Sequence, residues 1–467
     1  MEDTTIHMLL VMKLKRCYAV LRTLLHMLPS WLFRSCSFEL AEPIAHIYNC
    51  SIHSGAVPNP WRIAIVTPVP KVPCPASLGE YRPISVTPIL SRLAEKFIVR
   101  RFLRPAIPAD AVLDQFAFRP TGSTTCALVC LQHHVARLLE TNSYVRCIVI
   151  DFSKAFDMVD GRISVLLSKL SAFAIPANIL NWIIDFLTGR QQLCKIDGRL
   201  SALVNINRSI IQGSGLGPTL YIGMKSDLTT VGSDNVIMKY ADDVDLLVPE
   251  HSAVDVNIEI SHIKTWAVAN KMVLNLEKTK ELVFHRPNPL NFVCPAAVDA
   301  IEQVKLAKLL GVYVQSNFCC EEHVKYILSV CSQRIYLLKM LRNRGLSPSQ
   351  LHLVCQAIVI SRLQYALPAW GGFLSADLKN RIDGFLRRLH KYGFTNQQFC
   401  IELLLRNADI TLFMKVLKND HCLHHLLPPT RTLNMQLRPA LHNCQLPICN
   451  YVLFKRSFII RSLFNRF

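Results

Sequence analysis

Three aspartates stand at positions where a carboxylate is costly unless a cation lies beside it. Asp151 directly follows the apolar run RCIVI, and the pair Asp242 and Asp243 separates the apolar segments VIMKYA and VDLLV. A single aspartate at a strand end is ordinarily a turn former or a helix cap. Two adjacent acids in an apolar hairpin, with a third ending another strand, instead indicate a site for Mg²⁺, which binds a few carboxylates together with substrate and water oxygens. Because Asp151 is distant from the pair in sequence, only the fold can show whether these side chains meet.

A second candidate site is the glycine-rich segment QGSGLGP at 212–218. Glycine adopts backbone conformations that other residues avoid, so Gly213, Gly215 and Gly217 together predict a tight loop. Glycine content alone is weak evidence for phosphate binding.

The elements that must position these residues follow from hydrophobic periodicity. The run VRCIVIDF has the length and β-branched composition of a strand that is buried on both faces. The prolines of RIAIVTPVPK (62–71) confine that strand to an edge or to an irregular hairpin. Further strands are expected on both sides of Asp197-Gly198 and at 236–248, 273–285 and 306–315.

Helices are predicted in the N-terminal, central and C-terminal parts of the chain. The helix at 90–103 is predicted from a stripe of Leu90, Leu93, Phe97 and Arg101. In the last third, an apolar stripe from Val324 to Leu338 predicts a helix that ends near Gly345. Other helices are expected at 6–28, 38–54, 160–172, 176–188, 348–366, 375–392 and 399–417. The sequence thus predicts an α+β centre and a helical C-terminal third.

Composition narrows the class of protein. With 51% hydrophobic residues the 467-residue chain can form a core, which excludes disorder along most of it. A net charge of +19 indicates a polyanionic partner, namely nucleic acid or an anionic membrane face, and a merely basic soluble surface stays open as the alternative. No run of about 18 uncharged apolar residues predicts a membrane span. The 17 scattered cysteines favour a reducing, intracellular location, in the nucleus or the cytoplasm.

From about residue 30 onward the chain resembles the reverse transcriptases of non-LTR (LINE-type, jockey/CR1-like) retrotransposons. Any single motif is weak evidence, but their shared order argues against coincidence. The matching segments are WRIAIVTPVPK (61–71), YRPIS (81–85), QFAFRPTGST (115–124), DFSKAFD (151–157), QGSGLGP (212–218), YADD (240–243), LNLEKTK (274–280) and LLGV (309–312).

This resemblance implies a right-hand polymerase fold and RNA-directed DNA synthesis. A helical N-terminal segment is expected at 1–56, fingers and palm at 57–316, and a helical thumb with a C-terminal extension at 317–467. The implied partners are an RNA template, a DNA primer and dNTPs, with no membrane. Two alternatives stay open, a catalytically silent nucleic-acid-binding remnant and a group II intron maturase, although no maturation domain is recognised.

The resemblance also implies roles for the acids and their neighbours. Asp151, Asp242 and Asp243 match acids that bind two Mg²⁺ ions, with Mn²⁺ as the alternative, and the backbone carbonyl of Phe152 completes a metal shell. Such ions activate the attacking 3′-hydroxyl and stabilise the leaving pyrophosphate. Phe156 matches a residue beneath the incoming sugar that excludes a 2′-hydroxyl; its alternative role is core packing.

Four basic residues and the glycine loop have further implied roles. Lys71 and Arg82 match finger residues that contact the triphosphate, for which the planar guanidinium is well suited; the alternative is solvated surface charge. Lys278 matches a proton donor to pyrophosphate, although an exposed lysine is an equal alternative. Arg119 would position template or nucleotide. Gln212 and Gly213 match the start of the loop that shapes the nucleotide pocket, whereas Gly215 stands where the family has an aliphatic residue.

Two features do not fit a complete element. The tail contains His421, Cys422, His424, His425, His442, Cys444 and Cys449. Their spacing lacks the paired ligands of a zinc motif, so we expect them to be core and surface residues. No region resembling an apurinic-type endonuclease precedes the fingers and residues 1–29 match poorly, so we expect a truncated copy or a gene model that begins inside an element.

Overall fold

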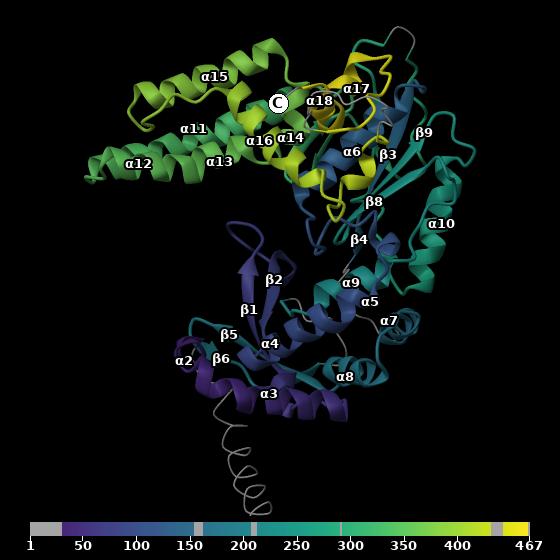
Figure 1. Cartoon of the computed structure of the whole chain (residues 1–467), viewed down its shortest axis with the longest axis vertical. Coiled ribbons are helices and arrows are strands. Elements are labelled where there is room, and N and C mark those ends of the chain that lie inside the picture. The colour runs from purple at the N-terminus through teal and green to yellow at the C-terminus, as the bar shows by residue number, and fades with distance from the viewer. Residues whose placement is uncertain (1–29, 154–161, 207–212, 290–291, 431–441, 466–467) are drawn as a thin grey trace, which may run out of the picture. The chain divides into compact units, whose positions relative to one another are not determined.

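The computed structural model describes residues 30–153, 162–206, 213–289, 292–430 and 442–465, which fall into two compact units (Figure 1). Unit 1 comprises Met1–Val112, Lys154–Asp227 and Val268–Met272, and unit 2 comprises Leu113–Ser153, Leu228–Ala267 and Val273–Phe467. Each unit has a hydrophobic core of its own. The domain boundaries expected near residues 56 and 316 fall inside unit 1 and unit 2, respectively, and stay a prediction.

The sheet of unit 1 explains how the prolines of the first strand are tolerated. Its strands are β1 (Ile63–Pro70), β2 (Tyr81–Val86), β5 (Arg190–Ile196), β6 (Arg199–Leu200) and β7 (Val204–Ile206). β1 pairs with β5 only over 63–66, whereas its antiparallel pairing with β2 extends over 65–70. Pro68 and Pro70 therefore lie where β1 has a partner on one side only, and the predicted hairpin is confirmed.

The helices of unit 1 pack around the hydrophobic core of that unit. They are α2 (Ser30–Ser35), α3 (Ser37–Ser54), α4 (Ile89–Ile98), the π-helical turn Val99–Leu103, α5 (Arg104–Ala106), α7 (Arg162–Ser171), α8 (Ala177–Leu187) and α9 (Gly217–Lys225). The helix predicted at 90–103 is confirmed as α4 and the π-helical turn after it, but the stripe that predicted it is not the buried face, because Leu93 and Phe97 are 44% and 46% exposed. α4 instead buries Leu90, Ala94 and Ile98, whose four-residue spacing defines the face that meets the core.

The sheet of unit 2 has the strand order β12-β11-β3-β9-β8. Its strands are β3 (Tyr144–Ile150), β8 (Val236–Tyr240), β9 (Asp243–Pro249), β11 (Lys280–His285) and β12 (Glu302–Val304). Short pairs form between β4 (Phe152–Ser153) and β10 (Val273–Leu274), and between β13 (Leu306–Leu309) and β14 (Val312–Gln315). Central β3 is buried on both faces as predicted, with Cys147 on one face and Ile148 on the other.

Helices make up most of the rest of unit 2 (Figure 1). They are α6 (Thr124–Leu138), α10 (Val256–Ala269), α11 (Glu321–Asn343), α12 (Pro348–Cys355), a π-helical turn at Gln356–Ile360, α13 (Ser361–Gln364), α14 (Leu367–Trp370), α15 (Ala376–Lys391), α16 (Ile401–Val416), α17 (Val452–Arg456) and α18 (Phe458–Phe464). α6 contributes most of its residues to the core that also contains the C-terminal helices. α11 ends at Asn343, near Gly345 as predicted, and Gly345 has a φ of +91°.

Two expectations from composition concern the described residues as a whole. Every cysteine in the part of the chain that the structure describes is a free thiol. Among these same residues, no helix combines the length and the apolar character that crossing a membrane requires.

Candidate active site

Strand register places the three predicted acids at one edge of the unit 2 sheet. Ile150, the last residue of β3, lies opposite Val244 of β9, so Asp151 and Asp243 each lie one position beyond this pair at the same end of the two antiparallel strands. Asp242 lies in the two-residue turn between β8 and β9. The fold therefore places Asp151, distant in sequence, at the sheet edge that carries the acidic turn.

The turn itself has a backbone that suits a tight hairpin. Ala241 has φ +56°, and Tyr240 pairs with Asp243 across the two-residue loop. Asp151 and Asp242 are half-buried and Asp243 is exposed, so solvent and a substrate can reach all three.

These acids fit an ion that prefers oxygen and takes part of its shell from substrate and water. Among the described residues, two groups of three cysteine and histidine side chains have their metal-ligating atoms within 4.8 Å of one another. The aspartates at this sheet edge do not form a group that close. A looser set of carboxylates at an accessible sheet edge agrees with Mg²⁺, which usually keeps several waters.

A turn at 275–279 holds the backbone of Asp151. The amide of Asn275 donates to the Asp151 carbonyl oxygen at 2.8 Å, and the Asp151 amide donates to Thr279 Oγ1 at 3.5 Å. Lys278 is exposed on this same turn, and its amide donates to Asn275 Oδ1. The structure thus brings Lys278 and Asp151 into one neighbourhood. Next along the chain, the ring of Phe152 is buried and lies 6.1 Å from that of Trp266.

The segment before α6 supports the acidic turn. Gln115 Oε1 accepts from the amides of Ala241 at 3.3 Å and Ala117 at 2.9 Å. Phe116 N–H donates to the Lys239 carbonyl, and Lys239 Nζ lies 2.7 Å from Asp114 Oδ2. Burial raises the pKa of Asp114, although Lys239 acts in the opposite direction. Sequence reasoning did not assign Gln115 a role, although it opens the quoted segment QFAFRPTGST.

A fourth acid near the turn also escaped the sequence analysis. Asp245 lies two residues beyond Asp243 on β9, so both side chains share one face of the strand. Burial, and secondarily the charge of Asp243, raises the pKa of Asp245 to about 7. The sequence DDVD at 242–245 places Asp243 and Asp245 two residues apart in an expected strand, and this spacing could have indicated that they share a face.

In unit 1, the two predicted triphosphate ligands lie at the same end of the β1–β2 hairpin. Arg82 pairs with Val69, and Lys71 follows directly after β1. Both side chains are exposed, and Lys71 Nζ donates to the Gly79 carbonyl oxygen at 2.7 Å. The hairpin therefore carries both cations near one end, and each is of a type that makes strong hydrogen bonds to phosphate.

The glycine loop of unit 1 contacts both β2 and α4. Gly213 has φ +117°, and a Cβ there would lie 2.4 Å from the Ser85 carbonyl oxygen, so only glycine fits. The fully buried Glu95 carboxylate accepts from Ser214 Oγ at 2.8 Å and from the Gly215 amide at 2.6 Å. Glu95 therefore holds the loop on α4, a role that its sequence context did not reveal.

Three further predictions have different outcomes. Phe156 and Gln212 lie outside the described residues. Arg119 is half-buried, and its Nη1 donates to the Gln115 carbonyl at 3.3 Å, which keeps it beside the segment that supports the acidic turn.

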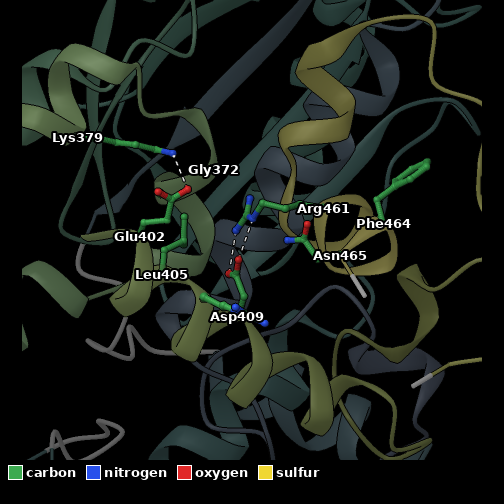
Figure 2. A pocket seen from close by; sticks show the side chains of 10 residues that line it. Gly372, Lys379, Glu402, Leu405, Asp409, Arg461, Phe464 and Asn465 are labelled. Atoms are coloured by element: carbon green, nitrogen blue, oxygen red, sulfur yellow. Dashed lines mark hydrogen bonds and ion pairs between the residues drawn. The ribbon is translucent and has the colours of Figure 1, made fainter. Parts of the chain in front are cut away.

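A pocket of about 690 Å³ among the C-terminal helices contains none of the predicted site residues (Figure 2). Arg461 of α18 donates from Nε and Nη2 to the two carboxylate oxygens of Asp409 on α16, each at 2.9 Å. Lys379 and Glu402 form a second, exposed pair at its rim, with 3.5 Å between Nζ and Oε1. Because the cations already face carboxylates, these contacts hold helices together.

Comparison with curated proteins agrees with the motifs. The chain is 27% identical over 319 residues to the probable RNA-directed DNA polymerase from transposon BS of Drosophila melanogaster, covering 64% of this chain and 34% of that protein. It is 24% identical over 353 residues to the corresponding X-element protein of the same organism, covering 72% of this chain and 38% of the relative. The chain thus spans about a third of the length of these relatives.

More distant similarity extends to a solved structure and a family model. Telomerase from Candida albicans aligns with a TM-score of 0.36 and 12% identity over 83% of this chain and 67% of that one. The model described as reverse transcriptase (RNA-dependent DNA polymerase) matches residues 69–314, more than half of the chain. The chain therefore belongs to the reverse transcriptase family, and its resemblance to the jockey-like elements of non-LTR type is confirmed.

Proposed function

We propose that this chain is an RNA-directed DNA polymerase of a non-LTR retrotransposon. It adds dNTPs to the 3′-hydroxyl of a DNA primer that is paired with an RNA template. The observation that supports this proposal is the pairing of Ile150 with Val244, because Asp151 and Asp243 each adjoin this pair and Asp242 lies on the turn next to it.

Asp151, Asp242 and Asp243, with the backbone carbonyl of Phe152, would hold two Mg²⁺ ions, and Mn²⁺ is the alternative. When bound, such ions lower the pKa of the attacking hydroxyl and neutralise charge on the leaving pyrophosphate. The Asn275 and Thr279 contacts hold the Asp151 backbone, which sets the direction of its carboxylate.

Residues of the β1–β2 hairpin, the glycine loop and the turn at 275–279 have proposed roles of their own in nucleotide addition. Lys71 and Arg82 bind the triphosphate, and Lys278 gives a proton to the departing pyrophosphate. Gly213, together with Gln212, shapes the nucleotide pocket, because its lack of a side chain lets the loop approach Ser85.

Two further proposed roles concern the sugar of the incoming nucleotide and the binding of template and primer. Phe156 matches a family residue that selects the sugar, and its proposed role is to exclude ribonucleotides. The net charge of +19 serves the RNA template and the DNA primer, which together with the dNTPs are the proposed partners. An intracellular location, in the nucleus or the cytoplasm, follows from these substrates.

Primer extension on an RNA template with Mg²⁺ tests the proposal. Asp151→Asn and Asp242→Asn each delete one oxygen ligand with little change in volume, so extension should fall by about 100-fold or more while template binding persists. Asp197→Asn is the matched control, because Asp197 is exposed on a hairpin turn at φ +48°, which asparagine also adopts.

Substantial extension by Asp151→Asn would contradict the metal assignment. A wild-type chain that binds template-primer but extends nothing, with either ion, would favour the catalytically silent remnant.

A further inference from the structure

Two groups of cysteine and histidine side chains lie between α6 and the segment that follows α16, all within unit 2. The ligand atoms of Cys126, His421 and Cys422 lie within 4.8 Å of one another, and all three residues are buried. We call these three residues the thiol cluster. Cys130, His134 and His425 form a second group within the same limit, but it ranges from buried to exposed.

Helical spacing explains how these groups arise. Cys126, Cys130 and His134 recur at four-residue intervals on α6, so they line one face of the helix. The tail residues 421–425 supply the remaining ligands. Spacing within the tail alone predicts no zinc motif, whereas the structure brings tail residues beside cysteine and histidine side chains of α6.

We propose that the thiol cluster of Cys126, His421 and Cys422 binds one Zn²⁺ ion. Thiolate and imidazole are the ligands that zinc prefers, whereas Mg²⁺ and Ca²⁺ prefer oxygen. Zn–S bonds of about 2.3 Å place two sulfurs of one tetrahedral ion about 3.8 Å apart, so atoms within 4.8 Å need only small side-chain rotations.

Thr121 lies at the same place and completes the surroundings of the ion. Its carbonyl oxygen accepts from Cys422 Sγ at 3.3 Å and from Cys126 Sγ at 3.6 Å. Three protein ligands leave a fourth position, which this oxygen or a water molecule fills.

The ion would join two segments that are far apart in sequence. The Cys422 amide already donates to Thr121 Oγ1 at 3.0 Å, across 301 residues. The loop that contains Thr121 begins at Gln115, whose side chain holds the turn before Asp242. Zinc would therefore fix the C-terminal segment to the loop that supports the acidic turn. Zinc binding itself does not depend on the proposed function; only an effect of this link on DNA synthesis does.

Metal analysis of the full chain tests the proposal without reference to polymerase activity. Protein purified under reducing conditions, without chelator and with zinc in the growth medium, should contain zinc by mass spectrometry. Replacement by Co²⁺ should give the visible bands of a tetrahedral site and thiolate-to-metal charge transfer. Cys126→Ser combined with Cys422→Ser should lose one equivalent of metal and the charge-transfer band.

Matched variants separate the thiol cluster from other thiols. Cys355→Ala removes a buried thiol on α12 and should keep the metal, as should Cys130→Ala, which removes the thiol of the second group. Should the double variant fail to fold, His421→Gln provides the second test, because the loss of one ligand should weaken zinc at least about 10-fold in chelator competition.

Three results would overturn the proposal. One is wild-type protein that retains neither Zn²⁺ nor Co²⁺. Another is metal that Cys130→Ala removes but the double variant keeps, which would assign it to the second group. The third is an intact mass showing a Cys126–Cys422 disulfide in freshly purified, unreduced protein.

Discussion

The side-chain oxygen of Gln115 accepts a hydrogen bond from the amide of Ala241 at 3.3 Å, although the two residues are 126 positions apart. Ala241 immediately precedes Asp242 and adopts the positive φ that the hairpin requires. The same oxygen accepts from Ala117, so one buried side chain joins the segment before α6 to the acidic turn. The position of Asp242 therefore depends on a residue that carries no charge.

Replacing Gln115 by Leu should lower the free energy of unfolding by about 1–3 kcal/mol, because the amides of Ala117 and Ala241 each lose a hydrogen bond to the buried side-chain oxygen. Urea unfolding measures this loss, and primer extension should fall as the turn loses its support. Gln132→Leu is the control, since the side-chain oxygen of buried Gln132 has no hydrogen-bond partner among the described residues. Equal stability of the two variants would contradict a supporting role for Gln115.

Gly213→Ala should destabilise unit 1 more than Gly198→Ala does. Both glycines have positive φ, at +117° and +79°, but only the Cβ at 213 meets a backbone oxygen, at 2.4 Å, whereas nothing lies within 4 Å of the one at 198. Relief of that overlap requires backbone movement, so an additional cost of about 1–3 kcal/mol is expected. Thermal unfolding of the two variants compares them directly, and a smaller loss for Gly213→Ala would count against the contact with Ser85.

If Phe156 has its proposed role, Phe156→Ala should raise the incorporation of ribonucleotides relative to deoxynucleotides, because a smaller side chain excludes a 2′-hydroxyl less well. Extension assays with each nucleotide type measure this ratio. An unchanged ratio, with reduced stability, would assign Phe156 to core packing instead.

Arg387→Gln combined with Arg388→Gln should weaken binding of template-primer regardless of sequence. Both side chains are exposed on α15, opposite its buried face of Leu378, Ile382 and Leu389. Each lost contact with a duplex phosphate should reduce the slope of log affinity against log salt by about 0.9. Replacing Lys195 and Arg199, which are exposed on the β5–β6 hairpin, controls for net charge. A salt slope identical to that of the wild type would show that the α15 arginines do not touch nucleic acid.

His323 should make stability fall in mild acid. Burial lowers its pKa to about 4, while Nδ1 accepts from the Tyr313 amide at 3.2 Å. Since the unfolded chain binds this proton near its ordinary pKa of about 6.5, its contribution to stability is complete above that pH and is lost as the pH falls towards 4. At pH 5 the loss should reach about 2 kcal/mol.

His323→Asn keeps an acceptor for the Tyr313 amide but cannot titrate, so it should lose less stability than the wild type between pH 7.5 and 5. Urea unfolding at the two pH values measures the difference. Parallel losses in both proteins would rule out His323 as the cause.

The sequence by itself determined the local elements and the identity of the acids. The β-branched run before Asp151 predicts the strand, and the apolar stripe from Val324 to Leu338 predicts α11, because side chains repeat with the period of the backbone that carries them. The positive φ at Gly213 likewise follows from a residue type whose conformational freedom is a local property.

Tertiary structure decided which distant residues meet. The buried face of α4 depends on the helices packed against it, so the stripe of Leu93 and Phe97 gave the wrong face. Glu95 gained its role from a loop that follows about 120 residues later. The thiol cluster needed α6 and the tail together, since neither segment alone has zinc spacing. Periodicity along a chain reports the geometry of one segment, whereas contacts between segments depend on how whole elements pack.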